Sequence, residues 1–300
     1  IILNEIQETS HFGFSNFYLR RARRILPILI FVIIFTIPLS YIYITPTSLV
    51  DFSKSIISSL TFISNIFFYI SEQQYAADNA NLKPLLHTWS LSIEEQFYLF
   101  FPIILFFFFK KNIFEKYLLK FFIFIIIFTF IIFIFTNYEN NKFIFYNSFY
   151  RIWELIAGAV LANIEIKYKR KKRSSFDFIY SVVGILLIIF SILFFNEDIN
   201  YPSIYTFIPV IGTMLVIWYI DENYYLAKIL NNRIIVFFGL ISYSLYLWHY
   251  PVFAFLNLHY IQVIEIQKYI SIIFIILISV LSYFFIEKPF RNKYFISNKL

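Results

Sequence analysis

Residues 20–44 read RRARRILPILIFVIIFTIPLSYIYI, four arginines followed by an apolar run that is long enough to cross a lipid bilayer. A membrane-spanning helix needs roughly 20 predominantly apolar residues. Comparable runs recur along the rest of the chain, and short groups of charged residues separate them. This alternation predicts membrane spans joined by loops.

The composition excludes an ordinary soluble domain. Of the 300 residues, 60% are hydrophobic and only 14% are charged, and a soluble domain of this size cannot hide so much apolar surface. The net charge of +7 comes from basic residues at the ends of apolar runs, where membrane orientation explains them better than nucleic-acid binding. No cysteine is present, so disulfides and thiolate metal sites are excluded, and we expect no metal site.

Eight apolar stretches predict complete spans, at about 25–44, 91–109, 118–136, 150–166, 177–195, 203–220, 234–254 and 268–286. We therefore expect an all-α, polytopic transmembrane helix bundle that forms one domain over residues 1–300. A ninth stretch, about 55–70, is shorter and rich in serine, so its apolarity alone does not decide whether it crosses.

The distribution of basic residues predicts the topology. If 55–70 does not cross, 20 of the 25 lysines and arginines fall on one side of the membrane, whereas a crossing 55–70 would divide them 16 against 9. The positive-inside rule favours the first layout, with the Arg20–Arg24 cluster and the C-terminus both cytoplasmic. The chain opens on Ile1-Ile2-Leu3 without a methionine, and we expect it to begin at the end of a membrane helix whose body precedes residue 1.

Polar groups retained in so apolar a chain are costly, so each is a candidate functional residue. The first group is the cluster Arg20, Arg21, Arg23 and Arg24 at the mouth of the first span. Guanidinium groups offer forked pairs of donors that suit phosphate oxygens. A topology anchor explains the cluster equally well.

The second group is HTWSLSIEEQFY, residues 87–98, which places Glu94 and Glu95 about one turn into an apolar stretch. Trp89, Glu94 and Gln96 cannot all face lipid cheaply, so we expect this side of the helix to line a cavity. Helix capping by Ser90 explains part of the pattern.

Two further groups lie near the ends of the last two spans. Ser242, Tyr246 and His249 have the i, i+4, i+7 spacing of one helical face. Glu287 and Arg291 are four residues apart with Pro289 between them, and an ion pair at a helix end is as good an explanation as a catalytic role. Arg151 and Glu154 form a weaker case of the same kind.

Together, these blocks resemble the acyltransferase-3 family of integral membrane acyltransferases, over essentially the whole chain. The resemblance implies ten spans with both ends cytoplasmic, so about two spans would precede residue 1, in the bacterial cytoplasmic (inner) membrane. It implies transfer of an acyl group, often acetyl, from cytoplasmic acyl-CoA to a hydroxyl of an envelope polysaccharide or lipid-linked sugar. Acyl-CoA would be a co-substrate rather than a tightly bound cofactor, and the partners would be membrane lipid, the carbohydrate acceptor and an SGNH-type periplasmic domain.

The resemblance also implies roles for particular residues. The family's Arg-x-x-Arg motif maps onto Arg21 and Arg24, with Arg20 and Arg23 as an overlapping alternative, and is associated with the donor. The family's histidine base lies in an Arg-x10-His motif of the first span, which we expect before residue 1, so the chain as written is expected to be inactive. Candidate catalytic residues in this chain are Glu94, Glu95, His87, His249, Glu287 and Arg291, and candidate residues of the substrate path are Trp89, Gln96, Ser242 and Tyr246.

Several alternatives stay open from the sequence. Direct transfer is the default mechanism, but Ser90 or Ser92 could carry a covalent acyl group. A transporter or flippase of a lipid-linked sugar would use the same buried polar line without acyl-transfer chemistry. A membrane-bound glycosyltransferase is a weaker third reading, because Asp78 stands alone where an acidic pair would be expected.

Overall fold

The computed structural model describes residues 12–73, 79–110, 114–136, 141–168, 176–196, 203–260 and 262–292, together with residues 2, 5 and 199. Every regular element in these ranges is helical, which confirms the predicted all-α class. Among the described residues, five helices are long and apolar enough to cross a membrane. Asp78 lies outside the described ranges.

All eight stretches predicted as spans contain helix. The five long helices are α2 (Phe14–Tyr43), α5 (Thr88–Lys110), α9 (Phe176–Phe194), α12 (Arg233–His259) and the continuous segment Glu265–Arg291. This last segment consists of α13 (Glu265–Ser282), a π-helical turn η5 (Tyr283–Glu287) and α14 (Lys288–Arg291). The other three stretches hold α6 (Phe114–Phe135), α8 (Ile152–Tyr168) and α10 (Phe207–Tyr219). The orientation of these helices across a bilayer stays a prediction.

The ninth stretch, 55–70, is not one helix. It is divided between α3 (Pro46–Leu60) and α4 (Ser64–Ser71). Phe62 lies between them with a φ of 55°, in the left-handed region that stops a helix. The Thr45 side chain caps the start of α3, and Pro46 occupies its first turn, where a missing N–H costs nothing. Neither helix reaches the length of a complete span, and the side of the membrane on which this stretch lies stays a prediction.

The described chain groups into two compact units. The first comprises residues 1–12 and 93–236, and the second comprises residues 13–92 and 237–300. The single domain predicted for residues 1–300 stays a prediction.

In the first unit, α5, α6 and α8 share one apolar core. It consists of Phe97 and Leu105 from α5, Leu118 and Phe122 from α6, and Ile156 and Val160 from α8. Shorter elements complete the unit: α7 (Asn141–Tyr146), η3 (Ser148–Tyr150), η4 (Ile204–Thr206) and α11 (Tyr225–Leu230).

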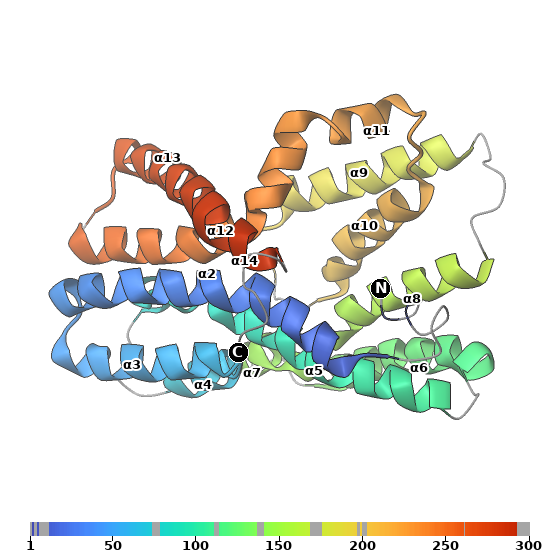
Figure 1. Cartoon of the computed structure of the whole chain (residues 1–300), viewed down its shortest axis with the longest axis horizontal. Coiled ribbons are helices and arrows are strands. Elements are labelled where there is room, and N and C mark those ends of the chain that lie inside the picture. The colour runs from blue at the N-terminus through green and yellow to red at the C-terminus, as the bar shows by residue number, and fades with distance from the viewer. Residues whose placement is uncertain are drawn as a thin grey trace. The chain divides into compact units, whose positions relative to one another are not determined.

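Helices α9 and α10, also of the first unit, lie side by side (Figure 1) and meet at two glycines. A Cβ added to Gly184 would lie 2.7 Å from the Gly212 carbonyl oxygen, and one added to Gly212 would lie 2.8 Å from the Gly184 carbonyl oxygen. The two backbones are therefore in direct contact. Small residues at such crossings are typical of helix packing in membranes, where close approach replaces the hydrophobic driving force.

In the second unit, α2 and α12 run in the same direction. The Tyr243 hydroxyl donates to the Ile25 carbonyl (3.1 Å), the Phe35 ring lies 6.1 Å from the Trp248 ring, and the Tyr43 ring lies 5.4 Å from His259. The residue numbers of the contacts increase along both helices, so α2 and α12 are parallel. The Trp248 indole N–H donates to Ser282 on α13 (2.8 Å), and α13 runs back alongside α12.

A buried hydroxyl network fixes the break between α3 and α4 to the start of α5. Thr88 bonds Ser59 (2.8 Å) and Ser64 (3.0 Å), and Ser64 bonds Ser92 (2.7 Å). All four side chains are at most 1% exposed. Buried hydroxyls need such partners, so this network explains why a serine-rich stretch can lie inside an apolar bundle.

The glycine contact predicts the effect of adding side chains. Gly212→Val should lower the thermal midpoint of the purified protein by several degrees, because overpacking costs about 1–3 kcal/mol and backbone lies in the way. Gly239→Val is the matched control, since a Cβ there meets no heavy atom within 4 Å. Equal midpoints for the two variants, measured by thermal unfolding in detergent, would contradict the close α9–α10 packing.

Candidate functional site

The most deeply buried charge in the second unit is the carboxylate of Glu287, whose side chain is 1% exposed. The Ser244 hydroxyl donates to one oxygen (2.9 Å), and the Arg291 guanidinium donates to the other (3.3 Å). Arg24 on α2 adds a favourable electrostatic interaction with the same carboxylate. The structure therefore brings Glu287 and Arg291 together, as their spacing predicts, and joins them to the arginine cluster.

Pro289 accounts for the local backbone that turns Glu287 inward. Proline cannot donate to the carbonyl four residues earlier, and its ring clashes with that carbonyl. The preceding residues, Tyr283–Glu287, form the wider π-helical turn, a feature that recurs at functional sites. The π turn and α14 both contact α2. The Glu-Lys-Pro sequence thus builds the corner at which three helices meet.

The four arginines lie in the first turns of α2, between buried Phe17 and the buried apolar residues from Ile25 onward. Arg20 and Arg24 are exposed, and Arg21 and Arg23 are half-buried. The buried face of the helix continues through Ile25, Ile28, Leu29, Val32 and Ile33 at helical spacing. The cluster therefore lies at the end of a long apolar helix, beside Glu287 and Arg291.

A second polar group surrounds His87, which immediately precedes α5. Its ring lies 5.2 Å from the Tyr246 ring, 5.5 Å from the His249 ring and 5.4 Å from the Tyr250 ring, with the last pair stacked. The Tyr246 hydroxyl donates to the His87 carbonyl and also bonds the Ser90 hydroxyl (2.8 Å). Two of the three residues predicted to share a face of α12, Tyr246 and His249, thus meet the histidine of the other motif. We refer to these four side chains, His87, Tyr246, His249 and Tyr250, as the histidine cage.

The backbone fixes the tautomer of His249. Its Nδ1 lies 2.6 Å from the Tyr246 carbonyl oxygen, which can only accept a hydrogen bond, so Nδ1 carries the proton when the ring is neutral. The lone pair of neutral His249 is then on Nε2. That nitrogen has the chemistry of a general base.

His87 is held in its neutral form. The side chain is 5% exposed, and neither ring nitrogen has a hydrogen-bond partner among the described residues. Burial lowers the pKa of His87 well below its usual range, and the nearby His249 lowers it further. A buried histidine with unused nitrogens is a place where a ligand or water can bind.

The remaining predicted residues lie on α5 and α12. Gln96 lines a cavity of about 140 Å³ in the first unit, where it accepts a hydrogen bond from Ser148. Glu94 is exposed, and Glu95 and Trp89 are half-buried. Gln96 thus lines a cavity, as expected, and the same expectation for Trp89 and Glu94 stays a prediction.

Ser242 is exposed, and its hydroxyl donates to the Gly239 carbonyl one turn earlier (2.8 Å). Sequence reasoning missed Ser244 and Tyr250, which contact Glu287 and His87 directly. Both residues lie in the same stretch of α12 as Ser242, Tyr246 and His249, but only the packing of the other helices shows which side chains meet a partner.

The two serines considered for a covalent intermediate have structural partners. Ser92 has no exposed surface and belongs to the hydroxyl network with Ser64. Ser90 is half-buried and bonds Tyr246. Among the described residues, no group of three or more histidine, aspartate or glutamate side chains could hold a metal ion.

Comparison with known proteins agrees with this fold and these motifs. The family described as "Acyltransferase domain" matches residues 3–286, so the chain belongs to this family, as predicted. With its apolar helices, it is a multi-pass membrane protein. No solved structure matches it significantly.

Its curated relatives include "Putative O-acetyltransferase SACOL0978" of Staphylococcus aureus (strain COL), 29% identical over 305 residues, and O-acetyltransferase OatA of Staphylococcus aureus (strain NCTC 8325 / PS 47), 29% identical over 309 residues. Each alignment covers 98% of this chain and 50% of the relative. The chain thus spans about half the length of the curated relatives it matches.

The environment of His87 predicts an acid-sensitive stability. Because the folded state disfavours charged His87, its neutral form contributes stability above the unfolded pKa of about 6.5, and this contribution is lost as the pH falls below that value. The thermal midpoint should therefore drop between pH 7 and pH 5, and His87→Phe should reduce the drop. Exposed His259 provides the control, since His259→Phe should leave the pH dependence unchanged. The same pH dependence in all three proteins would contradict the assignment.

Proposed function

We propose that this protein transfers an acyl group, most simply acetyl, from cytoplasmic acyl-CoA to a hydroxyl of a cell-envelope carbohydrate. Membership of the acyltransferase family supports the reaction, and the names of the relatives support O-acetylation. The observation that carries the donor assignment is the arginine cluster at one end of α2, next to the Glu287 corner.

The cluster suits a phosphorylated donor. Coenzyme A carries several phosphate groups, and arginine binds phosphate through paired N–H donors that lysine lacks. Glu287 neutralises part of the local positive charge and orients Arg291 through a hydrogen bond. The excess of arginine over carboxylate at this corner leaves a net positive charge for an anion.

The reaction breaks the thioester C–S bond and forms an ester C–O bond to the sugar. The sugar hydroxyl loses its proton, and the departing thiolate of coenzyme A gains one, so atoms and charges balance. Nε2 of His249 can accept this proton and return it, and the neighbouring His87 is neutral. The burial of Ser92 supports direct transfer.

The proposed orientation has the arginine cluster and the C-terminus in the cytoplasm of a bacterial cell, with the chain in the inner membrane. The uneven division of basic residues supports it. Acyl-CoA would then reach the cluster from the compartment in which it is made.

Paired substitutions at Arg21 and Arg24 test the donor site. In the full-length protein in lipid nanodiscs, Arg21→Ala with Arg24→Ala should weaken acetyl-CoA binding by at least about tenfold, because each lost charged hydrogen bond costs roughly 1.5–3 kcal/mol. Arg21→Lys with Arg24→Lys keeps the charge and should still weaken binding, since the forked donors are lost. Binding is measured by titration calorimetry.

Arg233→Ala is the matched control, because Arg233 is an exposed arginine at the start of another long helix. It should bind acetyl-CoA as the parent does. If the alanine pair binds acetyl-CoA as tightly as the parent, the cluster is a topology anchor and the donor assignment is wrong. A flippase without acyl-transfer chemistry would give that result.

A further inference from the structure

The second unit contains a cavity of about 130 Å³ at the end of α2 that is opposite the arginine cluster. Arg24 and Tyr43 are 19 residues apart on α2, which corresponds to roughly 28 Å along the helix axis. That length matches the hydrocarbon thickness of a bilayer, about 30 Å. The cavity and the proposed donor site are therefore separated by one membrane thickness.

One face of α3 supplies the polar wall. Ser48, Asp51, Phe52 and Ser55 line the cavity, and their i, i+3, i+4, i+7 spacing is that of a single helical stripe. This stripe places the Asp51 carboxylate between the hydroxyls of Ser48 and Ser55. The opposite wall comes from Phe67, Phe68 and Ser71 of α4.

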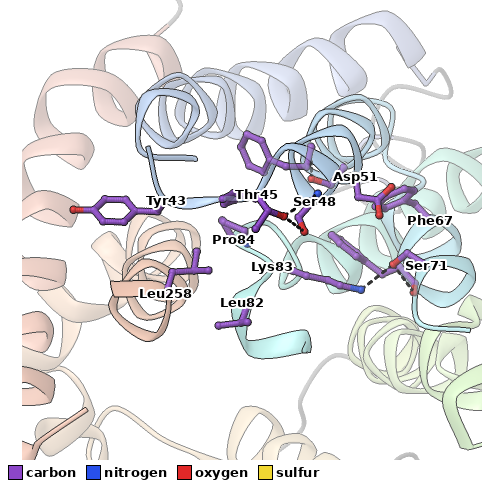
Figure 2. A pocket seen from close by; sticks show the side chains of 14 residues that line it. Tyr43, Thr45, Ser48, Asp51, Phe67, Ser71, Leu82, Lys83, Pro84 and Leu258 are labelled. Atoms are coloured by element: carbon purple, nitrogen blue, oxygen red, sulfur yellow. Dashed lines mark hydrogen bonds between the residues drawn. The ribbon is translucent and has the colours of Figure 1, made fainter. Parts of the chain in front are cut away.

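Lys83 completes the polar set from the segment after η1 (Ala80–Leu82). Its side chain extends along the cavity, and its ammonium group donates to the Ser71 hydroxyl at 3.1 Å (Figure 2). Asp51 lies on the neighbouring helix and lines the same space, with its carboxylate also paired to Lys54 (3.3 Å). The cavity thus offers a positively charged hydrogen-bond donor, Lys83, and a negatively charged acceptor, Asp51.

The apolar part of the lining is aromatic. Tyr43, Phe52, Phe67 and Phe68 all line the cavity, with Phe52 and Phe68 buried. A pyranose ring has hydroxyl groups around its rim and C–H bonds on its faces, so it is bound by hydrogen-bonding groups at its edge and aromatic rings against its face. The lining has this combination, and binding pockets in general pair apolar walls with a few placed polar groups.

The volume sets the size of the ligand. An apolar cavity of about 150 Å³ holds one benzene ring. A cavity of about 130 Å³ is therefore too small for a nucleotide or an oligosaccharide and is of the size of one six-membered ring. A longer carbohydrate would have to bind with a single unit inside.

We propose that this cavity binds one pyranose ring of the carbohydrate acceptor, with Asp51 and Lys83 bonding its hydroxyls. The assignment rests on the proposed acyl transfer and names the acceptor site within it. The cavity also adjoins the histidine cage along the chain: Pro84 lines the cavity, and His87 follows three residues later. Tyr250 of the cage donates to the Ala80 carbonyl (3.0 Å), which ties the two groups together.

Ligand binding can be measured without the reaction. The full-length protein in lipid nanodiscs is mixed with methyl glucopyranoside or methyl N-acetylglucosaminide, and saturation-transfer NMR reports which sugar protons contact protein. The parent should saturate the ring protons of at least one glycoside. Asp51→Asn with Lys83→Gln should reduce the signal at least about tenfold, because two charged hydrogen-bonding groups are lost.

Ser48→Phe provides a second variant that keeps both charges and fills the cavity. It should abolish the signal with a thermal midpoint close to that of the parent. Lys268→Ala is the matched control, because Lys268 is an exposed lysine that pairs with Glu265 and lies outside the cavity lining. It should retain the full signal.

The pocket assignment is overturned if neither glycoside is saturated by the parent, or if both cavity variants bind as the parent does. Acetyl-CoA binding, measured on the same nanodiscs, separates this result from a failure of the proposed function. Sugar binding without acetyl-CoA binding would keep the pocket and contradict the acyl donor. Acetyl-CoA binding without sugar binding would contradict the pocket alone.

Discussion

The fully buried carboxylate of Glu287 constrains the second unit more than any other group. A charge surrounded by apolar helices is stable only when partners satisfy it, and loss of one partner leaves an uncompensated charge. Ser244 provides a partner from α12, Arg291 from α14 and Arg24 from α2. Because these residues come from three helices, the carboxylate fixes the register of α13 against α12 and holds the arginine end of α2 beside them.

The sequence predicts the helices well, because an apolar run of membrane length can satisfy its backbone hydrogen bonds in lipid in few structures other than a helix. It does not predict where 55–70 breaks. The break depends on Ser64, whose hydroxyl partner Ser92 lies 28 residues away, and on the left-handed backbone of Phe62. Such a network forms only after distant segments pack, so composition shows that the stretch is polar without showing what satisfies it.

Local spacing predicts pairs on one helix and fails for groups built from several. Glu287 and Arg291 meet as their i, i+4 spacing implies. Trp89 and Gln96 are seven residues apart and share a face of α5, but Glu94 is displaced by roughly 140° around the helix and is exposed. The contact between His87 and His249 joins two motifs that are far apart in the sequence, and the helical periodicity of either motif does not predict it.

Helix α12 contacts the Glu287 corner, the histidine cage and the cavity, and therefore sets the relative depth of these three groups. Ser244 bonds Glu287, His249 contacts His87, and Leu258 lines the cavity at the far end. At 1.5 Å per residue, Ser244 and Leu258 are roughly 21 Å apart along the axis. A helix hardly changes length, so the order of arginine corner, histidine cage and cavity is built into α12. The proposed donor site and the proposed sugar site lie at the two ends of this order, with the histidine cage between them.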